Sequence, residues 1–76
     1  MRYQIQRLIL KNGNLLKEKD LESECPVLEA DIAPVVGDTM EVTAFGRHFP
    51  VEVVWGNWPG REHDPAFVIR LRVKEI

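Results

Sequence analysis

The fold is decided by a ten-residue stretch near the C-terminus, Ala66-Phe67-Val68-Ile69-Arg70-Leu71-Arg72-Val73-Lys74-Glu75. Apolar side chains occupy alternate positions in it, and charged side chains stand between them. A period of two places successive side chains on opposite faces of a β-strand. The stretch therefore predicts a strand that buries one face, with the charged face in water. The side chains that we expect to face inward are Phe67, Ile69, Leu71 and Val73, and those that we expect to face outward are Arg70, Arg72 and Lys74.

The same period runs through the residues upstream. Met40, Val42 and Ala44 share one face of a strand predicted over Thr39–Phe45, and a turn is predicted at Gly46-Arg47. The next strand places four more large side chains in phase with one another, Phe49, Val51, Val53 and Trp55. We therefore expect Trp55 to lie in the core.

The N-terminal stretch Arg2–Lys11 begins with the same alternation, but its apolar phase slips at Leu8-Ile9-Leu10. Either this part is buried on both sides, or a bulge near Gln6-Arg7 shifts the register by one residue. Asn12-Gly13 then predicts a hairpin with a type I′ turn, because both central positions of that turn need positive φ. A second strand is expected through Leu15-Leu16.

The middle of the chain is less regular. Lys17–Glu24 is rich in charge, and we interpret it as the frayed end of the hairpin, with a single helical turn as the alternative. Pro26 and Pro34 bracket an extended stretch, because proline disfavours helix interiors and central strands. Gly37-Asp38 has turn chemistry: glycine accepts positive φ, and an aspartate side chain bonds nearby backbone.

Together these elements predict one all-β domain over residues 1–76, a five-stranded antiparallel barrel or meander with at most one helical turn. The turn Pro34–Asp38, followed by a valine-rich meander with a tryptophan, resembles small SH3-like barrels among uncharacterised bacterial and phage proteins. The resemblance covers Pro34–Glu75, with Arg2–Lys11 as a first strand, and it implies a fold rather than a function. The acidic segment before Pro34 lacks the aromatic pair with which SH3 domains hold proline-rich ligands.

Composition places the chain among globular proteins and limits its partners. The chain has 76 residues, 10 Lys and Arg against 12 Asp and Glu, and a net charge of −2, which gives no basic excess of the kind found in duplex binders. Glu18 to Glu41 holds eight acidic residues and only Lys19 as a basic residue. We interpret the part Glu18 to Asp31 as a solvated loop, with an acidic surface presented to a nucleic-acid enzyme as the alternative. The single cysteine favours a reducing interior, no segment is long enough to cross a membrane, and we expect a cytoplasmic protein.

The sequence predicts no catalytic residue, metal or cofactor. Cys25 stands in an acidic stretch, where neighbouring carboxylates raise a thiol pKa and suppress the reactive thiolate. His48 is expected to be a solvated turn residue. His63-Asp64 lies at a loop tip with no hydroxyl nucleophile beside it, and nothing in the spacing gathers metal ligands.

Two candidate binding surfaces stand out. The first is the loop after Trp55, where Trp58, Arg61 and His63 combine a flat indole with polar donors; the alternative is that Trp58 folds back to plug one end of the barrel. The second is a basic stripe of Arg70 and Arg72, joined by Arg2 and Arg7 if the first and last strands pair. Its alternative is an ordinary charge ladder, with Glu52 near Arg70 and Arg72 and with Glu41 beside Glu52. The full set of candidate contact residues is Trp58, Arg61, His63, Arg70, Arg72 and Arg47.

Three functions are compatible with these features. The leading hypothesis is a non-enzymatic binding module that contacts another protein or a second copy of itself. The second is a binder of an anionic ligand, a nucleotide or nucleic acid, through Arg70, Arg72 and Trp58. The third, an enzyme, requires that Cys25 or one of the histidines acts in catalysis.

Overall fold

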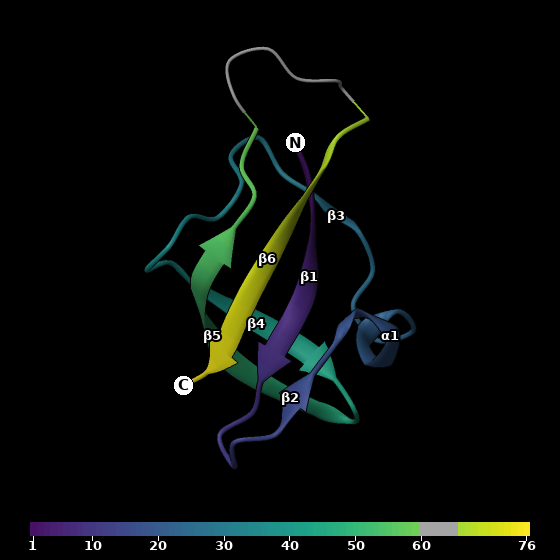
Figure 1. The fold of residues 1–76 in the computed structure, drawn as a ribbon, viewed down its shortest axis with the longest axis vertical. Coiled ribbons are helices and arrows are strands. Elements are labelled where there is room, and N and C mark those ends of the chain that lie inside the picture. The colour runs from purple at the N-terminus through teal and green to yellow at the C-terminus, as the bar shows by residue number, and fades with distance from the viewer. Residues whose placement is uncertain (60–65) are drawn as a thin grey trace.

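The protein is mostly β-structure, as the sequence predicts. The structure, a computed structural model, describes residues 1–59 and 66–76. Six strands and one helical turn occur in this part of the chain, in the order β1 (Arg2–Ile9), β2 (Leu15–Leu16), α1 (Glu18–Leu21), β3 (Leu28–Glu29), β4 (Thr39–Ala44), β5 (Arg47–Gly56) and β6 (Val68–Glu75) (Figure 1).

All the described strands belong to one sheet, in the order β2-β1-β6-β5-β4, and β3 also pairs with β1. The strands β1 and β6 run side by side in the same direction, so the sheet is mixed (Figure 1). The prediction of five antiparallel strands is therefore wrong, and the sheet is not closed into a barrel. The physical reason is that a period of two is the same in parallel and antiparallel strands, so it carries no information about strand direction.

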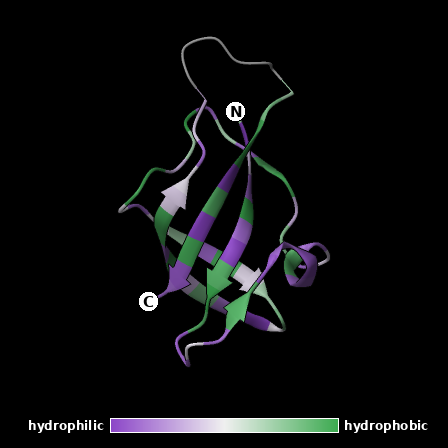
Figure 2. Cartoon of the chain, viewed as in Figure 1, coloured by the Kyte–Doolittle hydropathy of each residue, from purple (hydrophilic) through white to green (hydrophobic). Residues whose placement is uncertain are grey.

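The core lies on the inner face of this sheet, which curls so that β4 and part of β5 pass behind β1 and β6 (Figure 1). Ile69, Leu71 and Val73 on β6 are at most 1% exposed, which confirms the predicted inner face of the last strand. Figure 2 shows the corresponding alternation of hydrophobic and hydrophilic bands along β6. Burying this face removes branched side chains from water, which stabilises the folded state by about 25 cal/mol for each Å² of apolar surface buried.

The slip of phase in β1 is a bulge, the second of the two predicted alternatives. The register against β6 shifts between Ile5 and Arg7. Leu8 is completely buried after the shift, whereas Ile9 is 43% exposed, so the strand is not buried on both sides. The extra residue of the bulge shifts the alternation by one position, so that Leu8 faces the core as Ile5 does before the bulge.

Both hairpin turns differ from the sequence predictions: the first in its type, and the second in its position, which is Phe45-Gly46 instead of Gly46-Arg47. Gly13 has φ +92° but Asn12 does not have positive φ, so Asn12-Gly13 is not a type I′ turn. The Leu10 N–H donates to Asn14 O at 2.8 Å, which closes a three-residue loop with glycine at its left-handed position. The two-residue turn with positive φ at both central positions is Phe45-Gly46, at φ +54° and +72°.

The acidic middle segment contains the single helical turn that was the alternative prediction. Leu21 is the buried residue of α1, at 1% exposure, and it packs into the core cluster. This tertiary contact stabilises a helix that is too short to form on its own. After it, β3 pairs with the start of β1. No helix among the described residues has the length and apolar composition that crossing a membrane requires.

The turn before β4 is confirmed. Gly37 has φ +96°, and the Val35 N–H donates to Asp38 Oδ2 at 3.0 Å. The turn is bonded to β5, because the Gly37 N–H donates to Val53 O and the Val53 N–H donates to Asp38 O, both at 2.9 Å. These bonds fix the point at which β4 begins along the edge of the sheet.

Candidate functional site

The open seam of the sheet lies between β4 and the segment Glu24–Leu28. A pocket of about 220 Å³ occupies this seam. Its lining is mostly apolar and comes from β1, β4 and the segment that leads to β3: Ile5, Glu24, Cys25, Pro26, Leu28, Met40, Glu41, Val42 and Thr43. The failure of the sheet to close therefore leaves an apolar slot beside an edge strand.

The exposed edge of β4 carries unpaired backbone groups. Ala44 and Arg47 flank the two-residue turn and form a hydrogen-bonded pair, and every second residue back along β4 bonds to β5 in the same way. At the other end of the strand, the Val53–Asp38 bond has the same phase. The N–H and C=O groups of Glu41 and Thr43 consequently point away from β5, toward the seam, where no described strand pairs with them.

Carboxylates stand at the rim of the seam. Glu24 accepts a hydrogen bond from the Phe45 N–H at 3.2 Å, which joins the segment after α1 to the β4–β5 turn. Glu41 Oε2 lies 3.1 Å from His48 Nε2, and His48 Nδ1 lies 2.7 Å from Thr43 Oγ1 on the same exposed surface. The rim therefore has an acidic character that agrees with the acidic stretch of the sequence.

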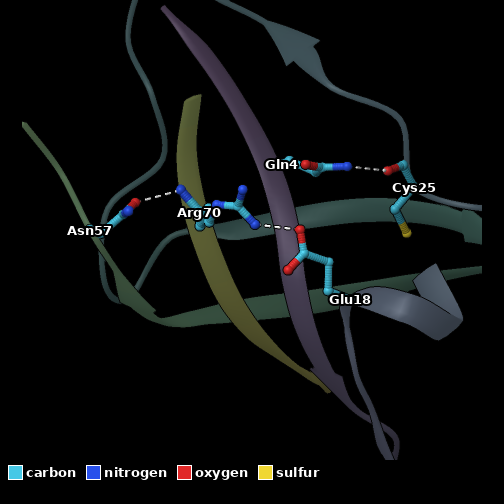
Figure 3. A network of polar contacts seen from close by, with 5 residues as sticks. All are labelled: Gln4, Glu18, Cys25, Asn57 and Arg70. Carbon is cyan, nitrogen blue, oxygen red and sulfur yellow. Dashed lines mark hydrogen bonds and ion pairs between the residues drawn. The ribbon is translucent and has the colours of Figure 1, made fainter. Parts of the chain in front are cut away.

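Cys25 is a buried free thiol in the wall of this seam. Burial, and next the Glu24 carboxylate, raises the pKa of the Cys25 thiol above 9.0. The residue is held in place through its backbone, since Gln4 Nε2 donates to Cys25 O at 3.5 Å (Figure 3). A raised pKa keeps the sulfur protonated at neutral pH, the opposite of what an activated nucleophile needs.

The second surface is the outer face of β1, β6 and β5. Arg70 faces outward on β6, but its guanidinium is bonded to the Glu18 carboxylate of α1 (Figure 3). Its backbone N–H donates to Asn57 Oδ1 at 2.5 Å. Arg70 is thus engaged by the acidic helical turn, a contact that the sequence does not indicate because the two residues are 52 positions apart.

Arg72 has a different neighbour. Its guanidinium carbon lies 4.1 Å from the ring centroid of Trp55, a cation–π contact. Trp55 is 39% exposed, so its predicted place in the core is wrong. The register of β5 against β6 shifts between Val53 and Trp55, and this bulge turns Trp55 to the outer face.

Trp58 folds back onto the protein, as the alternative interpretation predicts. It packs against the core cluster, and its indole N–H donates to Pro34 O at 2.8 Å. The polar atom of its ring is therefore already satisfied. The tryptophan that stands beside the outward arginines is Trp55 rather than Trp58.

Arg47, the remaining candidate residue that the structure describes, does not join these two arginines. Arg47 lies at the start of β5, with its guanidinium carbon 4.8 Å from the Phe49 ring centroid and Nη2 2.5 Å from Glu75 Oε2. Arg61 and His63 fall outside the described residues. The predicted charge ladder also differs in register, because Glu52 is opposite Lys74, and Glu41 is opposite Pro50.

Glu75 ties together the end of the sheet at which Arg47 lies. Its side chain is 6% exposed, and Oε1 accepts the Lys11 N–H at 3.0 Å while Oε2 contacts Arg47. The Lys11 N–H, and then Arg47, lower the pKa of Glu75 below 4.5 against an opposing effect of desolvation. A carboxyl with a lowered pKa stabilises the fold while it is ionised, and this contribution is lost as pH falls through the folded-state pKa.

We therefore expect Glu75→Gln to have a lower free energy of unfolding than the parent protein at pH 7. This difference in free energy should become smaller as the pH is lowered below about 4.5. Urea unfolding at pH 7, 5, 4 and 3 measures the difference. Glu52→Gln, on β5 opposite Lys74, is the control for removal of one carboxylate. A Glu75→Gln deficit that stays constant from pH 7 to pH 3 would show that the ionised carboxylate is not what stabilises this end.

The described residues contain no group of three or more histidine, cysteine, aspartate or glutamate side chains placed to hold a metal ion. Comparison of the chain with protein-family models, curated proteins and solved structures found no match.

Proposed function

We propose that this chain is a non-enzymatic binding module that takes an extended segment of a partner protein along the free edge of β4. The observation that carries the proposal is the combination, in one seam, of outward backbone groups at Glu41 and Thr43 with an apolar pocket. A strand added to an exposed edge gains main-chain hydrogen bonds, and its alternate side chains enter pockets that supply specificity. An uncovered edge of this kind is otherwise an aggregation hazard.

The size of the pocket favours a peptide side chain over a whole small molecule. Sites for drug-sized ligands measure about 300–1,000 Å³. The volume in the seam, about 220 Å³, is below that range and is open along β4. A segment that pairs with the strand would direct every second side chain toward Ile5, Met40 and Val42.

The charge of the rim sets the chemistry of the partner. Glu24 and Glu41 border the pocket, and the stretch Glu18 to Glu41 holds eight acidic residues against Lys19 alone. Complementary charge steers encounter and selects among partners. The segment that fits has apolar residues at alternate positions with lysine or arginine between them.

Two further features support a binding role over catalysis. The Cys25 thiol has a raised pKa, and His48 is engaged with Glu41 and Thr43 on an exposed surface. A single free cysteine also supports action in the cytoplasm. A resemblance in fold to small SH3-like barrels is part of the same proposal, supported by the turn at Gly37-Asp38 and the β4–β5–β6 meander.

Thr43→Pro is expected to weaken peptide binding by about tenfold or more, because it removes an N–H that faces the seam and places a ring there. The fold should persist, since proline is tolerated on edge strands where its N–H would face solvent. The probe is a set of peptides selected against the parent protein from a random display library. Affinities of the peptides for each variant are measured by titration calorimetry.

Thr43→Val is the matched control. It removes the same hydroxyl, 2.7 Å from His48 Nδ1, but keeps the backbone N–H, so it should bind the selected peptides within about twofold of the parent. Equal affinities of the proline and valine variants, or selected peptides without alternating apolar residues, would contradict strand addition. A dimer that Thr43→Pro dissociates would assign the edge to a second copy of the chain.

A further inference from the structure

Two bulges converge on a single arginine. In β1 the register shifts at Gln6, so Leu71 is opposite Ile5 and Arg72 is already opposite Arg7. In β5 the register shifts at Val54, so Val73 is opposite Val53 and Arg72 is opposite Trp55. Each bulge adds one residue beside Arg72 on the outer face. Bulges re-aim side chains and are frequent beside functional sites.

The bulges surround Arg72 with groups that do not satisfy it. Arg72 Nε is buried, and its N–H has no hydrogen-bond acceptor. Gln6 Oε1 is also buried, and no donor bonds to it. Arg7, which lies opposite Arg72 on β1, also carries a positive charge. Like charges at opposed positions repel, and a buried polar group without a partner destabilises the fold.

Two other arginines of the described chain form ion pairs. Arg70 is bonded to Glu18, and Arg47 is bonded to Glu75. Neither Arg72 nor Arg7 has an ion pair with any described carboxylate. The difference separates Arg72 from an ordinary solvated ladder, in which each cation would face an acid.

We propose that Arg72, Arg7, Gln6 and Trp55 form a binding site for a phosphate group. The Arg72 guanidinium carbon lies over the Trp55 ring, 4.1 Å from its centroid, and the terminal Nη groups of Arg72, rather than the buried Nε, are the donors for a bidentate anion. A phosphate between the two arginines replaces their repulsion by attraction. The part of the Trp55 side chain that remains exposed lies beside this position and offers a surface for a nucleotide base.

The site is distinct from the β4 seam, because the seam is lined by the core-facing side chains of Ile5 and Val42, whereas Arg7 and Arg72 lie on the outer face of the sheet. A phosphate group of this kind occurs in a free nucleotide and in the backbone of a single-stranded nucleic acid. The two sources differ in salt dependence, because binding along a nucleic-acid backbone releases several counterions.

The test titrates the protein with inorganic pyrophosphate, with ADP, and with a thymidine oligonucleotide about ten nucleotides long. Affinity is measured by calorimetry, and the Arg72 Nε–H resonance is followed in proton–nitrogen NMR spectra. We expect binding of at least one probe together with a shift of the Nε–H resonance. Tighter binding of ADP than of pyrophosphate assigns the site to nucleotides, and a steep loss of oligonucleotide affinity with salt assigns it to single strands.

Arg7→Gln and Lys74→Gln form the matched pair of variants, since both remove one exposed positive charge from the outer face. Arg7 faces Arg72, whereas Lys74 faces Glu52. We expect Arg7→Gln to weaken binding roughly tenfold, and Lys74→Gln by less than about twofold. Arg72→Lys, which keeps the charge but loses the planar fork, should also weaken binding by roughly tenfold.

Three results would overturn the site. One is the absence of binding for all three probes at concentrations of about 10 mM. Another is equal loss of affinity in Arg7→Gln and Lys74→Gln, which would indicate diffuse charge. The third is binding that leaves the Arg72 Nε–H resonance unmoved.

Discussion

Gly56→Ala is expected to lower the free energy of unfolding by about 1–3 kcal/mol, the usual cost of forcing extra atoms into packed structure. A Cβ at this position would lie 2.6 Å from Cζ2 and 2.7 Å from Cη2 of the Trp58 indole. Trp58 is not free to withdraw, because its N–H is bonded to Pro34 O and its ring packs on the core. Glycine at this position therefore provides space rather than an unusual backbone angle.

Urea unfolding of Gly56→Ala in two backgrounds tests this explanation. In the Trp58→Leu background the indole is absent, so Gly56→Ala should change the free energy of unfolding only slightly. It could raise it by a few tenths of a kcal/mol, because alanine has less conformational entropy than glycine in the unfolded chain. The same loss in both backgrounds would show that Trp58 does not lie over Gly56. That result would also return Trp58 to the set of exposed candidate residues.

Leu21→Ala is expected to lower the free energy of unfolding by about 2–4 kcal/mol, in the range for buried leucines. A chain of this length has a total stability of only about 4–11 kcal/mol. Leu21 is 1% exposed and is the residue by which α1 enters the core. Its loss should also release the Glu18–Arg70 pair, because Glu18 lies on the same helical turn.

Leu15→Ala is the control for this prediction. Leu15 precedes α1 by a few residues but is 45% exposed, so its truncation should change stability by less than about 0.5 kcal/mol. Thermal and urea unfolding measure both variants, and the Arg70 side-chain resonances report the ion pair. Equal small effects of the two truncations would mean that α1 does not close over the core.

The strands with the strongest alternation could be predicted from sequence, and the reason is burial. Ile69, Leu71 and Val73 face the core because each second position of β6 must leave water. The bulge in β1 was also predictable, since an apolar run out of phase with its own strand requires either double burial or an extra residue.

Other features depended on contacts that sequence periodicity does not contain. Val54 and Trp55 are both apolar, so nothing marks the bulge that turns Trp55 outward and flanks Arg72. Phe45 takes positive φ because the register of β4 against β5 leaves two residues for the turn, although asparagine suits that angle better. The helical turn at Glu18–Leu21 exists through the burial of one leucine.

The candidate site was predictable only in part for the same reason. The period of two predicts that Arg70 and Arg72 both face outward. It does not predict that Arg70 is paired with Glu18 while Arg72 is not. Arg72 contacts the ring of Trp55, whereas the indole N–H of Trp58 donates a hydrogen bond to Pro34 O. Whether a strand lies at an edge depends on the order of the whole sheet, which short-range patterns do not encode.

The exchange of backbone amide protons along β4 tests the free edge most directly. In the protein alone, the N–H groups of Met40 and Val42 should exchange slowly because they bond to β5, while those of Glu41 and Thr43 should exchange rapidly with solvent. Saturation with a selected peptide should slow Glu41 and Thr43 selectively. Protection of those two amides in the free protein, or no change in them on binding, would contradict the account.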